Sequence, residues 1–151
     1  MTWKFDEQLL NYRNAYTAQA ILSCKYQDDY SIDSVKRYIR ALEYIKNVNS
    51  YLVCIDIINL GNIISPKNNG FRCTPAIFRN GNAAIHYSCI KRCIETLLDA
   101  RKEYSLDPRE FFYRFETIHP YNDGNGRIGE IIYYWMTGNF NAPHNIFSNH
   151  D

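Results

Sequence analysis

The sequence "PREFFYRFETIHPYNDGNGRIGEIIYYWMT", residues 108–137, predicts two helices joined by a short glycine-rich loop. Asp107 before it is a typical N-cap, Pro108 suits the first helical position, and the acidic residue three positions after the cap completes the start signal. The first helix should end at His119, because a residue that precedes proline is disfavoured in the helical region. The second should begin within residues 124–127 and bury an apolar face before Gly138.

The loop between these helices combines groups that suit phosphate chemistry. Backbone N–H groups of residues 124–126 lead directly into a helix start, where an anion binds well. Arg127 in the first turn is repelled by the helix dipole unless an anion lies beside it. Asp123 is placed to hold a magnesium ion that phosphates share, and His119 titrates near neutral pH and is the candidate general base. Taken singly, each of these residues is more often a cap or a turn residue.

Outward from this stretch, apolar residues recur at helical spacing in most of the chain. The pattern predicts four further helices, over residues 4–22, 31–48, 51–60 and 88–104. We expect the third to stop at Gly61 and the fourth to be capped by Ser88. Cys89 and Cys93 in the fourth are four positions apart and are interpreted as small core residues rather than metal ligands.

The segment "GFRCTPAIFRNGNAAIHYS", residues 70–88, breaks the helical period. It contains a proline, only short apolar pieces and the pair Asn80-Gly81, which is typical of a tight hairpin turn. We therefore expect a small β-hairpin, lying as a flap over another part of the molecule.

Composition restricts the class of protein. The 151 residues are the usual size of one domain, and 17 basic against 16 acidic residues leave no basic field for nucleic acid or anionic lipid. The longest apolar run, residues 51–64, contains Asp56 and is too short to cross a bilayer. Five scattered cysteines and an N-terminus without a signal-peptide pattern indicate reduced thiols in a cytosol, that of the cell of origin or of a host cell.

The order and spacing in the loop resemble the signature of the Fic domain (Fic/Doc superfamily), H-P-F-x-[DE]-G-N-G-R-x-x-R. The match runs from His119 to Arg127, with Tyr121 in place of phenylalanine. The resemblance covers residues from about 30 to 137, so residues 1–151 are interpreted as a single Fic-like domain. It implies an all-α fold with one small β-hairpin flap, and transfer of AMP from ATP to a Ser, Thr or Tyr hydroxyl of a target protein.

The resemblance also implies roles for individual residues. His119 would deprotonate the target hydroxyl, Asp123 would bind Mg²⁺ between the α- and β-phosphates, and Arg127 would hold the β-phosphate. Gly124, Asn125 and Gly126 would cradle the transferred phosphate. The flap would align the target segment by strand addition, with contacts from Arg72, Thr74, Ala76, Ile77 and Phe78.

Glu130 departs from the signature, because the family has its second arginine there, reading the γ-phosphate. Positions 127 and 130 are neighbours on one face of a helix, so we expect the carboxylate to point toward the same pocket and to weaken ATP binding. On that hypothesis the protein reacts slowly with ATP or prefers another nucleotide donor, and Glu130→Arg raises ATP affinity. The alternative is that Glu130 complements the helix N-terminus and pairs with Arg127.

The family's inhibitory motif, [ST]-x-x-x-E-[GN], has no copy in the chain, so we do not expect autoinhibition in the usual form. The resemblance also allows a separate inhibitor protein as a partner, whether the chain is a toxin or an effector delivered into a host cell. Two other functions stay open: a kinase-like phosphotransfer with the nucleotide reversed, and a catalytically idle Fic fold that serves as a binding module. Nucleotide binding separates the last from the other two.

Overall fold

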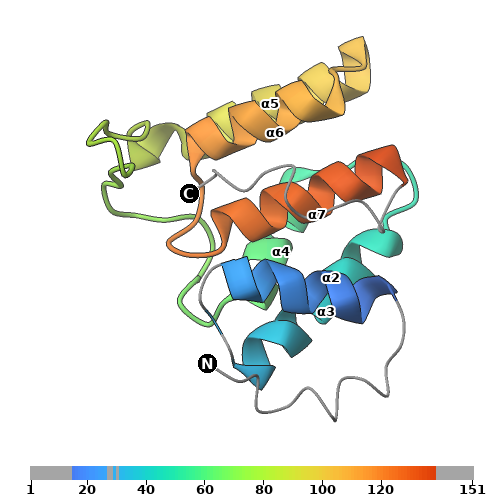
Figure 1. Ribbon diagram of the computed structural model, residues 1–151. Helices are drawn as coiled ribbons and strands as arrows, with labels where there is room; N and C mark the ends of the chain where they lie inside the picture. The colour runs from blue at the N-terminus through green and yellow to red at the C-terminus, as the bar shows by residue number, and fades with distance from the viewer. Residues whose placement is uncertain (1–14, 27–28, 30, 139–151) are drawn as a thin grey trace.

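The computed structural model describes residues 15–26, 29 and 31–138. Most of this part is helical, and no sheet is present within it, so the prediction of a mainly helical fold is confirmed. Figure 1 shows the α-helices and the short 3₁₀ turn η1: α2 (Ala15–Tyr26), α3 (Ile32–Lys46), α4 (Cys54–Ile64), η1 (Tyr87–Cys89), α5 (Ile90–Tyr104), α6 (Pro108–Ile118) and α7 (Asn125–Thr137).

Helix α7 is the centre of the fold. It packs against α6, α3 and α4, while α2 covers α3 and α5 lies against α6 on the other side (Figure 1). Ile128, Ile131 and Ile132 of α7 are completely buried among these helices. A helix enclosed on several sides has a fixed axis, so the loop at its start is held in place.

Caps explain where the helices around the site begin. Asp107 accepts hydrogen bonds from the N–H groups of Arg109 and Glu110 at 2.9 and 3.3 Å, as the sequence predicts. Ser31 caps α3 in the same way, through the N–H of Ser34. The prediction for Ser88 is wrong: the imidazole of His86 accepts from the N–H of Ser88 instead, so the segment begins as the 3₁₀ turn η1.

Gly61 does not end the third helix, contrary to the sequence-based expectation. Helix α4 continues to Ile64, and Gly61 lies buried inside it. A Cβ atom at this position would lie 2.3 Å from Cε1 of Tyr121. The glycine is therefore needed for the close approach of the Tyr121 ring to α4, and the phenol donates a hydrogen bond to the carbonyl of Ile57 in the same helix.

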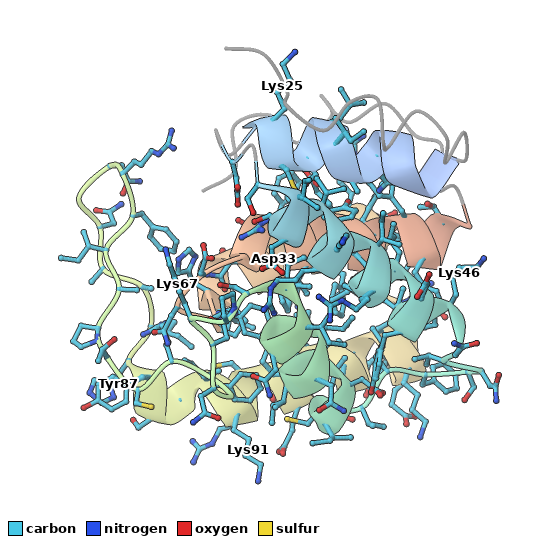
Figure 2. The ribbon with its side chains drawn as sticks, turned by 90° about the horizontal axis from the view of Figure 1, so that it is seen from below. Lys25, Asp33, Lys46, Lys67, Tyr87 and Lys91 are labelled. Carbon is cyan, nitrogen blue, oxygen red and sulfur yellow. The ribbon has the colours of Figure 1, made fainter. Side chains whose placement is uncertain are left out.

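The segment of residues 70–86, called the flap below, turns where the sequence predicts. Gly81 has φ +85°, and one antiparallel bridge joins Ile77 to Ala83. The N–H of Ala84 donates to Ala76 at 2.8 Å. Figure 2 shows this loop projecting from the helices, with Tyr87 at its base. The predicted hairpin is thus a hairpin-like loop with a single bridge rather than two paired strands.

Burial corrects the expectation for Cys89, which is exposed rather than a core residue. Cys93 is half-buried and packs against the core, and all five cysteines are free thiols. The part of the predicted helix 4–22 that precedes residue 15 lies outside the described residues. None of the described helices combines the length and apolar character that a membrane span requires.

Candidate active site

His119 stands at the end of α6 in a left-handed backbone conformation, with φ 52° and ψ 63°. Such a conformation is uncommon for a residue with a Cβ atom and must be held by its surroundings. The N–H of His119 donates to the carbonyl of Phe115 at 3.0 Å, and Pro120 prevents the helix from continuing. The imidazole is half-buried and packs nearly perpendicular to the Phe78 ring, with the ring centroids 5.1 Å apart.

Helix α7 begins without a side-chain cap, at Gly124 in a left-handed conformation (φ 84°). A Cβ atom there would lie 2.6 Å from Cγ2 of Ile64, so α4 closes directly on the turn. No acidic residue occupies the first turn of α7. The first N–H groups of α7 are therefore available to an anion in a pocket of about 110 Å³. Its lining residues are His119, Asn122, Asp123, Gly124, Asn125, Gly126 and Arg127.

Arg127 brings a nearly buried positive charge to this pocket. Its side chain is only 6% exposed, and its Nη2 atom lies 3.3 Å from Oδ2 of Asp123. Its Nε atom is buried and has no acceptor among the described residues. Desolvating a guanidinium is unfavourable unless an anion accepts its hydrogen bonds, so the site suits a further anionic group.

Asp123 has the exposure that a metal ligand at this pocket needs. Its side chain is 36% exposed, so one face of the carboxylate is open to the pocket while the other meets Arg127. The described residues contain no group of three or more His, Cys, Asp or Glu side chains that could hold a metal alone. This donor set fits Mg²⁺, which takes one or two carboxylates and completes its shell with water and phosphate oxygens.

Asn125 uses its side chain to shape the loop. Its Oδ1 accepts from the N–H of Tyr121 at 2.8 Å, and its Nδ2 donates to the carbonyl of Tyr121 at 3.0 Å. Both ends of the amide are thereby engaged within the loop. Asn125 can contribute its backbone N–H to an anion, whereas its side chain holds the turn closed.

Asn68, which sequence reasoning did not single out, fastens the same loop from outside. Its Oδ1 accepts from the N–H groups of Asn122 and Asp123, both at 3.1 Å. Its Nδ2 donates to the carbonyls of Gly61 and Asp123, both at 2.8 Å. One buried amide therefore makes four hydrogen bonds that join α4 to the pocket loop. Only its place in the turn-rich run "SPKNNG" marks it in the sequence, and that run predicts no more than a loop.

Glu130 does not point into the pocket, and this part of the sequence-based expectation is wrong. Its side chain is completely buried and is absent from the pocket lining. Oε2 accepts a hydrogen bond from Oγ of Ser23 in α2 at 3.1 Å. Burial raises the pKa of the Tyr38 and Tyr134 phenols, and the negative charge of Glu130 raises both further. Helix α2 covers position 130, which helical spacing within α7 does not reveal.

The flap residues divide into two groups. Ile77 is 73% exposed and Thr74 is exposed, as expected of a docking segment, while Ala76 is half-buried and Phe78 packs on His119. Arg72 differs from the sequence-based expectation, because it is only 3% exposed and its guanidinium donates to main-chain carbonyls. As it stands, Arg72 cannot contact a target from the surface.

The structure therefore brings His119, Asp123, residues 124–126 and Arg127 together around one pocket and leaves Glu130 and Arg72 outside it. Residues 99–137, which run from α5 through α6 and the pocket loop to the end of α7, match the family model of the Fic/DOC family. Among the curated proteins none matches the chain. The family match covers the helix-loop-helix that forms the pocket, and it supports the interpretation of the chain as a Fic-domain protein.

Proposed function

We propose that the protein is a transferase that moves AMP from ATP to a hydroxyl side chain of a target protein. The observation that carries the proposal is the anion site: Arg127 is almost fully buried with its Nε unsatisfied, beside the uncapped N-terminus of α7. The family match supports the same class of reaction. Phosphoryl chemistry of this kind depends on positioning and on charge neutralisation, which backbone amides and a buried guanidinium supply.

The pocket residues divide the reaction between them. His119 accepts the proton of the target hydroxyl as its oxygen bonds to the α-phosphorus, and the bond from that phosphorus to the β-phosphate oxygen breaks. Pyrophosphate leaves, and the target carries AMP. The N–H groups of residues 124–126 neutralise charge on the transferred phosphate, and Arg127 does so on the β-phosphate. Asp123 would hold Mg²⁺, whose charge neutralises phosphate oxygens when it is bound.

The position of Glu130 changes the expected treatment of the γ-phosphate. With a buried glutamate at position 130, no cation takes the place of the family's second arginine on α7. We therefore propose that the γ-phosphate contributes little to binding, so that ATP and ADP bind with similar affinity. Repulsion by Glu130 is not needed to explain this.

Radiolabelled nucleotide tests the proposal. The purified chain is incubated with Mg²⁺, a cell lysate and ATP labelled at either the α- or the γ-phosphate. We expect protein to retain label from the α position only. His119→Ala should reduce labelling about 100- to 10,000-fold, because His119 is the only histidine among the described residues that line the pocket.

Two outcomes would favour the other functions. Label retained only from the γ position would replace AMP transfer by the kinase-like reaction. Calorimetry with Mg²⁺ and a nucleotide panel addresses the idle binding module. Failure to bind any nucleotide at millimolar concentration would make that function the better one.

A further inference from the structure

We propose that Arg72 is a positioning residue that fixes His119 and the flap relative to each other. The proposal rests on the function proposed above for His119, the general base. Arg72 is thereby a buried support of the site rather than part of the target-binding surface that the sequence suggests.

The guanidinium of Arg72 joins two parts of the chain through four hydrogen bonds. On the α6 side, Nε donates to the carbonyl of His119 at 2.6 Å and Nη2 donates to that of Ile118 at 3.3 Å. On the flap side, Nη1 donates to Thr74 at 2.9 Å and Nη2 to Ile85 at 2.7 Å. Thr74 and Ile85 lie near the two ends of the flap, so one side chain holds both ends and the helix terminus at once.

The environment of Arg72 is built for a cation although no carboxylate pairs with it among the described residues. The carbonyls of Ile118 and His119 lie at the C-terminus of α6, the negative end of the helix dipole. Burial lowers the pKa of Arg72 from its ordinary value, which reflects desolvation. Arginine suits the place because its planar group reaches several acceptors in fixed directions, whereas a lysine ammonium is a single point charge.

Arg72 acts on the backbone that carries the base. His119 is left-handed, a conformation that needs support, and its carbonyl receives the shortest hydrogen bond from Arg72. The backbone N–H of Arg72 donates to the next carbonyl, that of Pro120, at 2.9 Å. Phe78, another flap residue, packs on the imidazole itself. The flap therefore contacts both the main chain and the imidazole ring of His119.

This arrangement has a functional consequence. A target segment aligned on the flap must present its hydroxyl to the imidazole within hydrogen-bond reach. If base and flap moved independently, that distance would vary, and a misplacement of about 1 Å can slow a reaction about 100-fold. With Arg72 in place, the flap and His119 move as one unit.

The experiment compares Arg72→Lys with the parent in the full chain, labelled with ¹⁵N and ¹³C. The first readout is the imidazole signal of His119 and its pH titration, assigned with His119→Ala. The second is the exchange rate of the flap amides of Phe78, Gly81 and Ala84, which are hydrogen-bonded within the flap. We expect a displaced His119 signal and flap exchange faster by about tenfold, because a lysine ammonium cannot reach all four acceptors of the Arg72 guanidinium.

Arg101→Lys is the matched control. Arg101 also donates to a main-chain carbonyl near a helix end, that of Leu106 at 2.7 Å, but on α5. The Arg101→Lys variant should show the His119 signal and the flap amide exchange rates of the parent. A second variant, Arg72→Ala, should regain the parent His119 signal when guanidinium ion is added at millimolar concentration but not with sodium chloride.

Unchanged His119 and flap signals in folded Arg72→Lys and Arg72→Ala would overturn the proposal. So would loss of the fold in both variants, because Arg72 would then serve the fold as a whole. Binding of magnesium and ATP should stay at the parent level in Arg72→Lys while transfer to protein slows about 10- to 100-fold. A parent chain that neither binds nucleotide nor transfers label refutes the proposed function alone, since the spectroscopic readouts need no nucleotide.

Discussion

Arg127 shows at the scale of a single residue why the pocket suits an anion. Its distance of 3.3 Å to Asp123 is longer than the roughly 2.7–2.9 Å of a strong charge-assisted bond, and Asp123 is itself partly exposed. The carboxylate therefore balances the buried guanidinium only in part. A phosphate oxygen could accept the remaining hydrogen bonds of Arg127, and Asp123 could at the same time bind a metal ion.

Replacing Asp123 by alanine should abolish the magnesium dependence of nucleotide binding. Among the described residues, Asp123 has the only carboxylate that lines the pocket, and magnesium prefers hard anionic oxygens. Calorimetric titration of ADP with and without Mg²⁺ measures the effect. Asp99→Ala, at an exposed position on α5, is the control and should behave as the parent. The metal assignment fails if the Asp123 variant still binds ADP more tightly when Mg²⁺ is added.

Replacing Glu130 tests whether this residue serves the buried core or repels the γ-phosphate of ATP. Glu130→Gln has the same shape and can still accept from Ser23, so we expect ATP affinity close to that of the parent. Glu130→Arg should destabilise the fold by about 3–5 kcal/mol, because it places an unpaired cation in a fully buried site on the same helix as Arg127. Urea unfolding and ATP calorimetry measure both effects. A Glu130→Arg variant that is stable and binds ATP more tightly would restore the repulsion hypothesis.

At the scale of helices and loops, the sequence predicts those helix ends that neighbouring residues determine. The start of α6 follows from Asp107 and Pro108, and its end follows from Pro120, because caps and proline act within a few residues. Gly61 was misinterpreted because its partner, Tyr121, is sixty positions away in the chain. The orientation of Glu130 was missed for the same reason, since α2 decides what covers that face of α7.

The connection between α4 and the pocket loop gives a prediction for Asn68. Asn68→Ala removes four hydrogen bonds, one buried and three part-buried, so it should lower stability by about 1–3 kcal/mol. Because two of those hydrogen bonds come from the N–H groups of Asn122 and Asp123, ADP affinity should fall as well. Calorimetry and urea unfolding measure the two effects. Asn59→Ala, which loses one hydrogen bond to Tyr44, should lower stability only. Parent-like ADP affinity in Asn68→Ala would show that the loop keeps its shape unaided.

For the molecule as a whole, the site is an assembly of distant parts. The pocket loop is closed by α4, the base is held by the flap, and α7 packs against α3, α4 and α6 (Figure 1). Apart from the contact between the consecutive helices α6 and α7, these contacts join segments that are distant in the sequence, so the pocket should form only when the core forms. Titratable groups that are buried in the core should then show, through the pH dependence of stability, whether the folded site persists.

Buried acidic groups predict how stability depends on pH. Burial raises the pKa of the Cys24 thiol from 9.0 to about 12 and holds the pKa of the Tyr38 and Tyr121 phenols well above their ordinary value of 10.0. Each group keeps its proton longer in the folded chain than in the unfolded chain. Their contribution is therefore fully present below the unfolded pKa and is lost as pH rises toward the folded pKa.

Stability should consequently change little between pH 7 and about pH 9 on account of these groups and then fall, by about 1.4 kcal/mol per pH unit for each group once it titrates in the unfolded chain. Urea unfolding at a series of pH values measures the slope. Tyr121→Phe removes one buried phenol and should make the decline above about pH 10 shallower, while Tyr104→Phe should not, because Tyr104 is 85% exposed. The comparison uses slopes, since Tyr121→Phe also loses the hydrogen bond to Ile57 at every pH. Equal slopes for the two variants would mean that the Tyr121 phenol reaches water before the molecule unfolds, and that the contact between the pocket loop and α4 opens on its own.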